Sequence, residues 1–260
     1  MAIMALEKDF CPFYRIILII HPPTFVKRSI DMEIIALRIP EFIEPDGLEL
    51  LMNKVSEKKR DKLSKYRRKE DLYRSLLGEL LVRVTACQYI GCKNEAIRFV
   101  YNRYGKPFLA EYPSFSFNLS HSGSWAVIIW DHRQQALGVD VEEIKPIHME
   151  IAERFFADTE YRDLVIKQGK DQLEYFFRLW TLKESYVKAM GKGLSIPFND
   201  FSLVQKGDNE WFSPEADRFH FKSFKADDRH SLSACAETED IPDQFKFMSF
   251  PALCRILEEI

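Results

Sequence analysis

The stretch that decides the fold is Gly138-Val139-Asp140-Val141-Glu142, in which small or apolar residues alternate with carboxylates. This alternation predicts a β-strand, because successive side chains of a strand project to opposite faces. Val139 and Val141 then share one face, and Asp140 and Glu142 share the other. The segment therefore predicts a strand with one apolar face and one face that carries two adjacent carboxylates.

Two carboxylates side by side repel each other unless a cation lies between them. Hard divalent cations prefer oxygen ligands, and Mg²⁺ accepts one or two carboxylates together with waters and substrate phosphates. Asp140 and Glu142 are thus a candidate metal site. The alternative is a solvent-facing acidic edge, which the neighbouring Glu143 also fits.

Strands and helices are mixed on both sides of this segment. Strand-like patterns lie at residues 33–39, 98–101, 116–119, 126–130, 137–141, 201–204, 219–224, 230–236 and 245–249. Helical spacing is found at residues 45–59, 62–89, 152–156, 160–167 and 172–190. No regular β-α-β alternation links them, which favours the α+β class. A polar connector at residues 131–135 predicts an N-terminal half at 32–132 and a C-terminal half at 133–260.

Residues 1–31 look like an extension outside this fold. Their apolar centre, residues 16–20, is shorter than the ~7 residues of a minimal signal-peptide core. No apolar run in the chain reaches the ~18 residues needed to span a bilayer. Two interpretations stay open: a start assigned upstream of Met32, or a loosely docked extension.

The chain has 260 residues, a hydrophobic fraction of 46% and a net charge of -3, which allows a sizeable core and argues against a general nucleic-acid coat protein. Its five cysteines are odd in number and lack zinc-ligand spacing, so we expect reduced thiols in the cytoplasm. Residues 54–69 hold nine lysines or arginines and two acids. Such a run is either a solvated helix face, a nucleic-acid contact or a binding patch for another anion.

A second candidate segment is Trp180-Thr181-Leu182-Lys183-Glu184-Ser185-Tyr186-Val187-Lys188. On a helix, Trp180, Glu184 and Lys188 lie along one face. Taken alone, Glu184 and Lys188 read as a surface ion pair. Lys183 falls within an apolar stripe, so its ammonium either reaches solvent or meets a buried anion.

Two further segments carry polar groups at turns. Phe117-Asn118-Leu119-Ser120-His121-Ser122-Gly123 offers hydroxyls, an imidazole and free backbone N–H groups, which suit a phosphate, although serine and glycine also favour turns for conformational reasons. A serine hydrolase using Ser120 and His121 is an alternative, but the chain lacks the Gly-x-Ser-x-Gly motif. Tyr104-Gly105-Lys106-Pro107 predicts a turn with Lys106 near its tip.

Taken in chain order (residues 104–107, 117–123, 138–142 and 180–185), the four segments resemble the surfactin-synthetase-activating class of 4'-phosphopantetheinyl transferases. Residues 69–71, 74–78, 154–156 and 160–161 extend the resemblance, which covers residues 32–260. It implies two similar α+β halves related by pseudo-twofold symmetry, with coenzyme A between them. It also implies a Mg²⁺-dependent enzyme of the holo-carrier-protein synthase type. Such an enzyme moves the phosphopantetheine arm of coenzyme A onto a carrier-protein serine and releases adenosine 3',5'-bisphosphate.

The resemblance further implies residue roles. The metal-binding carboxylates would be Asp140, Glu142 and Glu184, with Glu160 as a secondary candidate. The phosphates of coenzyme A would be lined by Lys59, Lys62, Ser75, Lys106, Ser120, His121 and Lys188, although the adjacent Lys58 permits a one-residue shift in the match. The catalytic set would be Asp140, Glu142, Glu184 and Lys188.

In the implied reaction, Glu184 takes the serine proton, directly or through water, while Lys188 and Lys106 stabilise the leaving group. The implied partners are apo acyl or peptidyl carrier proteins of peptide-synthetase, polyketide or fatty-acid systems. Neither nucleic acid nor a membrane is an expected partner, and we expect a monomer.

Overall fold

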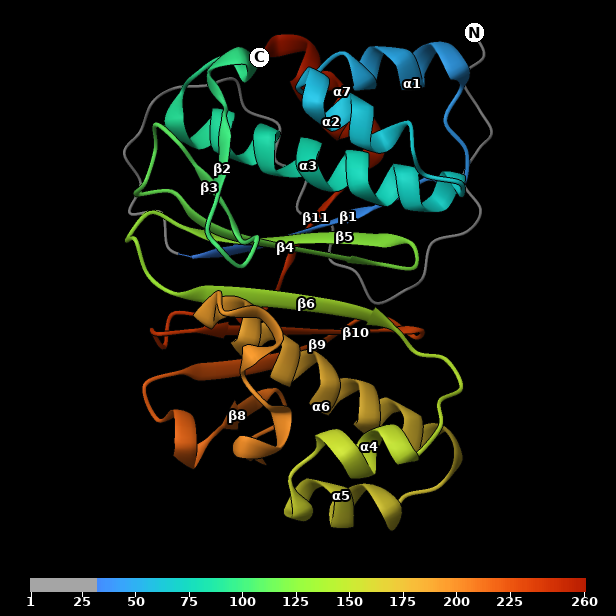
Figure 1. The fold of residues 1–260 in the computed structure, drawn as a ribbon, viewed down its shortest axis with the longest axis vertical. Helices are drawn as coiled ribbons and strands as arrows, with labels where there is room; N and C mark the ends of the chain where they lie inside the picture. The colour runs from blue at the N-terminus through green and yellow to red at the C-terminus, as the bar shows by residue number, and fades with distance from the viewer. Residues whose placement is uncertain (1–31) are drawn as a thin grey trace, which may run out of the picture. The chain divides into compact units, whose positions relative to one another are not determined.

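Strand β5 (Trp125–Asp131) is buried along its whole length and forms the centre of the first of two sheets. The computed structural model describes residues 32–260, and the predicted extension at residues 1–31 lies outside them. The first sheet has the strand order β11-β1-β5-β4, and the second has the order β6-β10-β9-β8-β7. A long helix covers the outer face of each sheet (Figure 1). The predicted α+β class with two similar halves is confirmed.

The strands of the first sheet are β1 (Glu33–Arg38), β4 (Ser116–Ser122), β5 and β11 (Lys246–Met248). Strand β1 pairs antiparallel with β5, which pairs antiparallel with β4, whereas β11 runs parallel to β1. The associated helices are α1 (Pro45–Met52), α2 (Glu57–Leu63), α3 (Lys69–Ile90) and α7 (Phe250–Glu259). A separate hairpin is formed by β2 (Phe99–Tyr101) and β3 (Pro107–Leu109), after a 3₁₀ turn at Asn94–Ala96.

The two helices predicted in this half have different boundaries in the structure. The predicted helix at residues 45–59 is divided into α1 and α2, because Ser56 accepts a hydrogen bond from the Lys59 backbone N–H and starts a new helix. The predicted helix at residues 62–89 begins only at Lys69. From Ser75 to Cys87 it is buried on all sides, as expected for a helix in the interior of a domain.

The second sheet consists of β6 (Leu137–Glu143), β7 (Val204–Gln205), β8 (Glu210–Phe212), β9 (His220–Asp227) and β10 (His230–Ala236). Its helices are α4 (Glu150–Phe155), α5 (Asp158–Val165) and α6 (Gly169–Met190). Short 3₁₀ turns occupy Gly193–Ser195, Phe198–Asp200 and Pro214–Ala216. Helices α3 and α6 both contain 22 residues, so each half repeats the plan of one long helix on one sheet.

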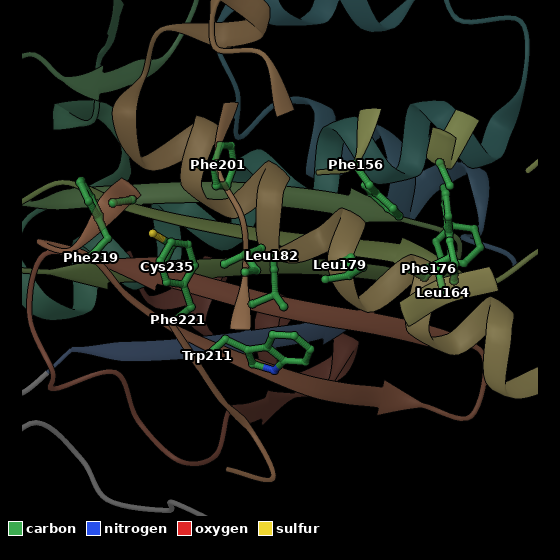
Figure 2. Packing of buried hydrophobic residues seen from close by; sticks show 14 of the residues in the cluster. Phe156, Leu164, Phe176, Leu179, Leu182, Phe201, Trp211, Phe219, Phe221 and Cys235 are labelled. Atoms are coloured by element: carbon green, nitrogen blue, oxygen red, sulfur yellow. The ribbon is translucent and has the colours of Figure 1, made fainter. Parts of the chain in front are cut away.

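Alternate residues of the strands build a hydrophobic core on each face of the second sheet. One core lies between the sheets, where Ile34 and Val127 of the first sheet join Val139, Val141 and Leu232 of the second. The other lies between α6 and the opposite face of the second sheet, and Figure 2 shows its aromatic and leucine side chains. Because Val139 and Val141 face the first core, Asp140 and Glu142 project toward α6.

The end of the chain returns to the first half. Strand β11 adds to β1, and α7 packs on α3. The proposed division at residue 132 therefore separates the two sheets except for this final segment, and the division stays a prediction. Within residues 32–260, none of the helices has the length and apolar character required to cross a bilayer.

Candidate functional site

The candidate site lies where α6 crosses β6, the first strand of the second sheet. Gly138 is required at this crossing, since a Cβ there would lie only 2.0 Å from the Ser185 carbonyl oxygen and 2.6 Å from the Ala189 nitrogen. The glycine lets the helix backbone touch the strand. This contact brings Glu184 and Lys188 of α6 to the carboxylate face of β6.

Asp140 is the most deeply buried of the three predicted metal ligands, with an exposed fraction of 2%. Its Oδ1 accepts hydrogen bonds from Lys188 Nζ at 2.6 Å and from Ser120 Oγ at 2.9 Å. Burial raises the pKa of Asp140, and the lysine and the serine oppose that shift. The second oxygen, Oδ2, is buried and has no hydrogen-bond partner among residues 32–260. A buried carboxylate oxygen without a partner is costly, which indicates that another group belongs there.

Glu142 and Glu184 share this shortage of partners. Ser122 Oγ donates to Glu142 Oε2 at 2.7 Å, and within residues 32–260 the other oxygen of Glu142 has no hydrogen bond. The Glu184 carboxylate has none at all in that part of the chain. Burial, followed by the charge of Asp140 and then that of Glu142, raises the pKa of Glu184 to about 7, although Lys188 opposes the shift.

These three carboxylates fit a hard divalent cation. Among residues 32–260, no three histidine, cysteine, aspartate or glutamate side chains form a ready-made metal cluster. The donor set is nevertheless suitable, because within residues 32–260 each carboxylate keeps an oxygen without a hydrogen bond, and the charge of Asp140 raises the pKa of both Glu142 and Glu184. A cation would provide the missing partner and remove the repulsion.

Positive charge gathers on the opposite side of the site, around His121. Burial lowers the pKa of His121, and the charges of Lys188, Arg74 and Lys59 lower it further. Lys59 Nζ donates to Ser75 Oγ at 3.1 Å and pairs with Glu79 at 3.3 Å. The cluster combines groups from α2, α3, β4 and α6 and is suited to an anion with several charges. Five of the predicted phosphate residues are thus located on or next to it: Lys59, Ser75, Ser120, His121 and Lys188.

Lys62 and Lys106 are placed differently from these five. Lys62 is exposed on α2. The Lys106 ammonium is turned inward and donates to the carbonyl oxygens of Lys188 (2.7 Å), Ala189 (3.1 Å) and Leu137 (3.2 Å). Burial lowers its pKa to about 8, so at pH 7 it still carries the protons for these bonds. The predicted phosphate role of Lys106 must therefore compete with three bonds to backbone carbonyls.

Lys183 meets a buried anion, one of the two outcomes expected from its apolar stripe. Its Nζ lies 2.9 Å from the Glu160 carboxylate, and both side chains are at most 1% exposed. The same ammonium donates to the Phe198 and Phe201 carbonyls. Glu160 also accepts the backbone N–H groups of Ala157 and Leu203. Glu160 is thus fully engaged in holding α5 to α6, and the secondary metal role expected for it does not fit.

Ser120 and His121 do not form a hydrolase pair in this structure. They are consecutive on β4 and project to opposite faces. Ser120 Oγ already accepts from the Val141 N–H and donates to Asp140, whereas His121 lies over Gly78 of α3.

The structure adds two residues to the site that the sequence did not predict there. Ser122 bonds Glu142, and Arg74 adds charge at His121 and donates to the Gly123 carbonyl. For Ser122, the available sequence signal was the alternation of the polar residues Asn118, Ser120 and Ser122 along one strand.

Comparison with known proteins identifies the family. A model of the 4'-phosphopantetheinyl transferase N-terminal region matches residues 44–133, and a model of the 4'-phosphopantetheinyl transferase superfamily matches residues 136–236. The 4'-phosphopantetheinyl transferase Sfp of Bacillus subtilis is 36% identical over 225 residues, which cover 85% of this chain and 100% of Sfp. The 4'-phosphopantetheinyl transferase gsp of Aneurinibacillus migulanus is 41% identical over 65% of this chain and 70% of its own length.

A solved holo-(acyl-carrier-protein) synthase from Bacillus anthracis, in complex with CoA (3',5'-ADP), is 18% identical. It covers 39% of this chain and 93% of its own chain, with a TM-score of 0.36. The relationship to Sfp spans the whole of that enzyme and includes the residues of the site described above. The chain belongs to the 4'-phosphopantetheinyl transferase family.

Proposed function

We propose that the protein transfers 4'-phosphopantetheine from coenzyme A to a serine of an apo carrier protein and uses Mg²⁺ to do so. The observation that supports the proposal is that one site combines a group of carboxylates with a group of cations. In the described part of the chain, three carboxylates that each keep an oxygen without a hydrogen bond stand beside a cluster of cations around His121. A pyrophosphate with its divalent cation satisfies both sides of this arrangement.

Asp140, Glu142 and Glu184 would hold the cation, whose charge would offset that of the pyrophosphate. Lys59, Ser75, Ser120, His121 and Lys188 would bind the phosphates, with Lys62 reaching them from the surface of α2. Since Lys188 already bridges Asp140 and Ser120, its ammonium lies at the border between the carboxylates and the cations. We place it beside the phosphate that leaves.

In the transfer step, the carrier serine oxygen forms a bond to the phosphorus that bears pantetheine. The bond from this phosphorus to the bridging oxygen breaks, and adenosine 3',5'-bisphosphate departs. In this proposal Glu184 accepts the serine proton, directly or through a water molecule. Lys188 then offsets the charge that develops on the leaving phosphate.

We further infer that the enzyme accepts peptidyl carrier domains, as a protein resembling the surfactin-activating class, and acts as a cytoplasmic monomer. The test incubates the purified full chain with coenzyme A, Mg²⁺ and apo carriers of peptide-synthetase, polyketide and fatty-acid type. The mass gain of each carrier is then read. One phosphopantetheine should be added, and none to a carrier whose acceptor serine is alanine. Absence of transfer to every carrier would refute the proposal.

A further inference from the structure

The two sheets meet through side chains rather than through a backbone ladder. Strands β4 and β6 each end their own sheet. Across the junction, Asn118 Oδ1 accepts the Val139 N–H at 2.9 Å. Ser120 Oγ accepts the Val141 N–H at 3.3 Å, and Ser122 Oγ accepts the Glu143 N–H at 3.2 Å. Alternate side chains of β4 thus fix its register against β6.

The two serines of this junction are thereby polarised. A serine hydroxyl has a single hydrogen to donate. Because Ser122 Oγ receives the Glu143 N–H, its own hydrogen is directed to Glu142 Oε2, which lies 2.7 Å away. Ser120 makes the equivalent pair of contacts with the Val141 N–H and Asp140 Oδ1. Each serine therefore points its hydrogen at one of the two carboxylates.

The two carboxylates depend on their serines to different degrees. Asp140 is also held by Lys188 and is almost completely buried. Glu142 is half-buried, has one more rotatable bond, and within residues 32–260 has Ser122 as its only hydrogen-bond partner. The direction of its free oxygen is consequently set by Ser122.

We propose that Ser122 is a positioning residue for phosphopantetheinyl transfer. Its hydroxyl holds one oxygen of Glu142, so that the other is presented to the divalent cation. This inference rests on the proposed function, in which Glu142 is a cation ligand. Partners of this kind, which orient a ligand without touching the cation, typically contribute 10- to 100-fold to metal affinity or activity.

The test compares Ser122→Ala with Ser122→Thr, which keeps the hydroxyl, and with Ser116→Ala as a matched control. Ser116 begins β4 on the same face, and its side chain makes no hydrogen bond within residues 32–260. Mn²⁺ is titrated calorimetrically into each full-length protein with coenzyme A present and carrier absent, so that binding is measured without turnover. The Mg²⁺ concentration for half-maximal transfer and both KM values are measured separately.

We expect Ser122→Ala to weaken Mn²⁺ binding roughly tenfold, with the KM for carrier unchanged. The threonine variant should recover most of the affinity, and Ser116→Ala should match the wild type. If alanine prevents folding, Ser122→Cys, with its weaker donor, provides the same comparison. Wild-type Mn²⁺ affinity in a folded Ser122→Ala enzyme would overturn the inference and leave the proposed function standing. A wild-type enzyme that transfers without any divalent cation would overturn both the inference and the proposed role of Mg²⁺.

Discussion

Lys106 Nζ lies 2.7 Å from the carbonyl oxygen of Lys188 and ties the turn after β2 to the last turn of α6. The Lys188 carbonyl also accepts the Gly191 N–H at 3.2 Å, and Lys106 adds a cation to the carbonyls at this helix C-terminus. Lys106→Met should therefore lower the melting temperature by several degrees, since each buried carbonyl left without a partner costs about 1–3 kcal/mol. The KM for coenzyme A should rise less than in Lys188→Ala. An unchanged melting temperature together with a large rise in that KM would instead identify Lys106 as a phosphate ligand.

Asp140→Asn and Glu142→Gln should each reduce transfer by about 10²-fold or more, because each removes a charge worth at least a few kcal/mol in the transition state. The fold should persist, since the amides keep the volume of the carboxylates. Glu143→Gln is the control, as it lies on the same strand and projects to the other face. Turnover is measured with saturating coenzyme A and carrier. Near-normal turnover of both folded variants would contradict the metal assignment.

Glu184→Gln should stabilise the protein at pH 8 in the absence of divalent cations while it abolishes transfer. The folded protein holds the Glu184 proton more tightly than the unfolded chain does, because its pKa is raised from 4.5 to about 7. The contribution of Glu184 to stability therefore falls as the pH rises through this window, whereas glutamine is unaffected. A gain of roughly 1 kcal/mol would raise the melting temperature by about 2–4 °C. At pH 4.5 the wild type and the variant should have the same melting temperature. If Glu184→Gln were less stable than the wild type at pH 8, the three carboxylates would not repel one another.

His121→Ala should raise the KM for coenzyme A roughly tenfold and leave the KM for carrier unchanged, since one hydrogen bond to a charged phosphate is worth about 1.5–3 kcal/mol. His132→Ala, in the connector between the halves, is the matched control. Steady-state kinetics with each substrate varied in turn provide the measurement. An increase confined to the carrier KM would move His121 from the coenzyme site to the protein interface.

The sequence alone predicted that Asp140 and Glu142 share one face of their strand. Side chains of a strand alternate between its two faces, so burial of Val139 and Val141 on one face places both carboxylates on the other. It was insufficient where the partner is distant in the chain. Lys183 was expected to meet either water or an anion, and only the fold brings Glu160 to it. The Lys106 side chain likewise points inward because α6 lies beside it, and the position of α6 cannot be predicted from the residues around Lys106.

Helix boundaries were the weaker part of the prediction. Three of the residues 64–68 are lysine or arginine, which have good helix propensity, yet α2 ends at Leu63 and α3 begins at Lys69. Helix α7 was missed, although Ser249 at its N-cap and Pro251 in its first turn were available as signals. Strands β3 and β8 contain three residues each, too few for an alternating pattern to be recognised.

The parallel pairing of β11 with β1 has a consequence for synthesis of the protein. The first strand of the described chain pairs with a neighbour that is translated only after the whole second sheet, and Leu253 and Leu257 of α7, which are buried in the folded protein, follow that neighbour. A nascent chain that stops before residue 246 leaves β1 with an open edge, which is a site for pairing with another chain. The first half is therefore complete only after the second half has been synthesised, and a chain truncated before residue 246 should yield aggregates rather than a shorter enzyme.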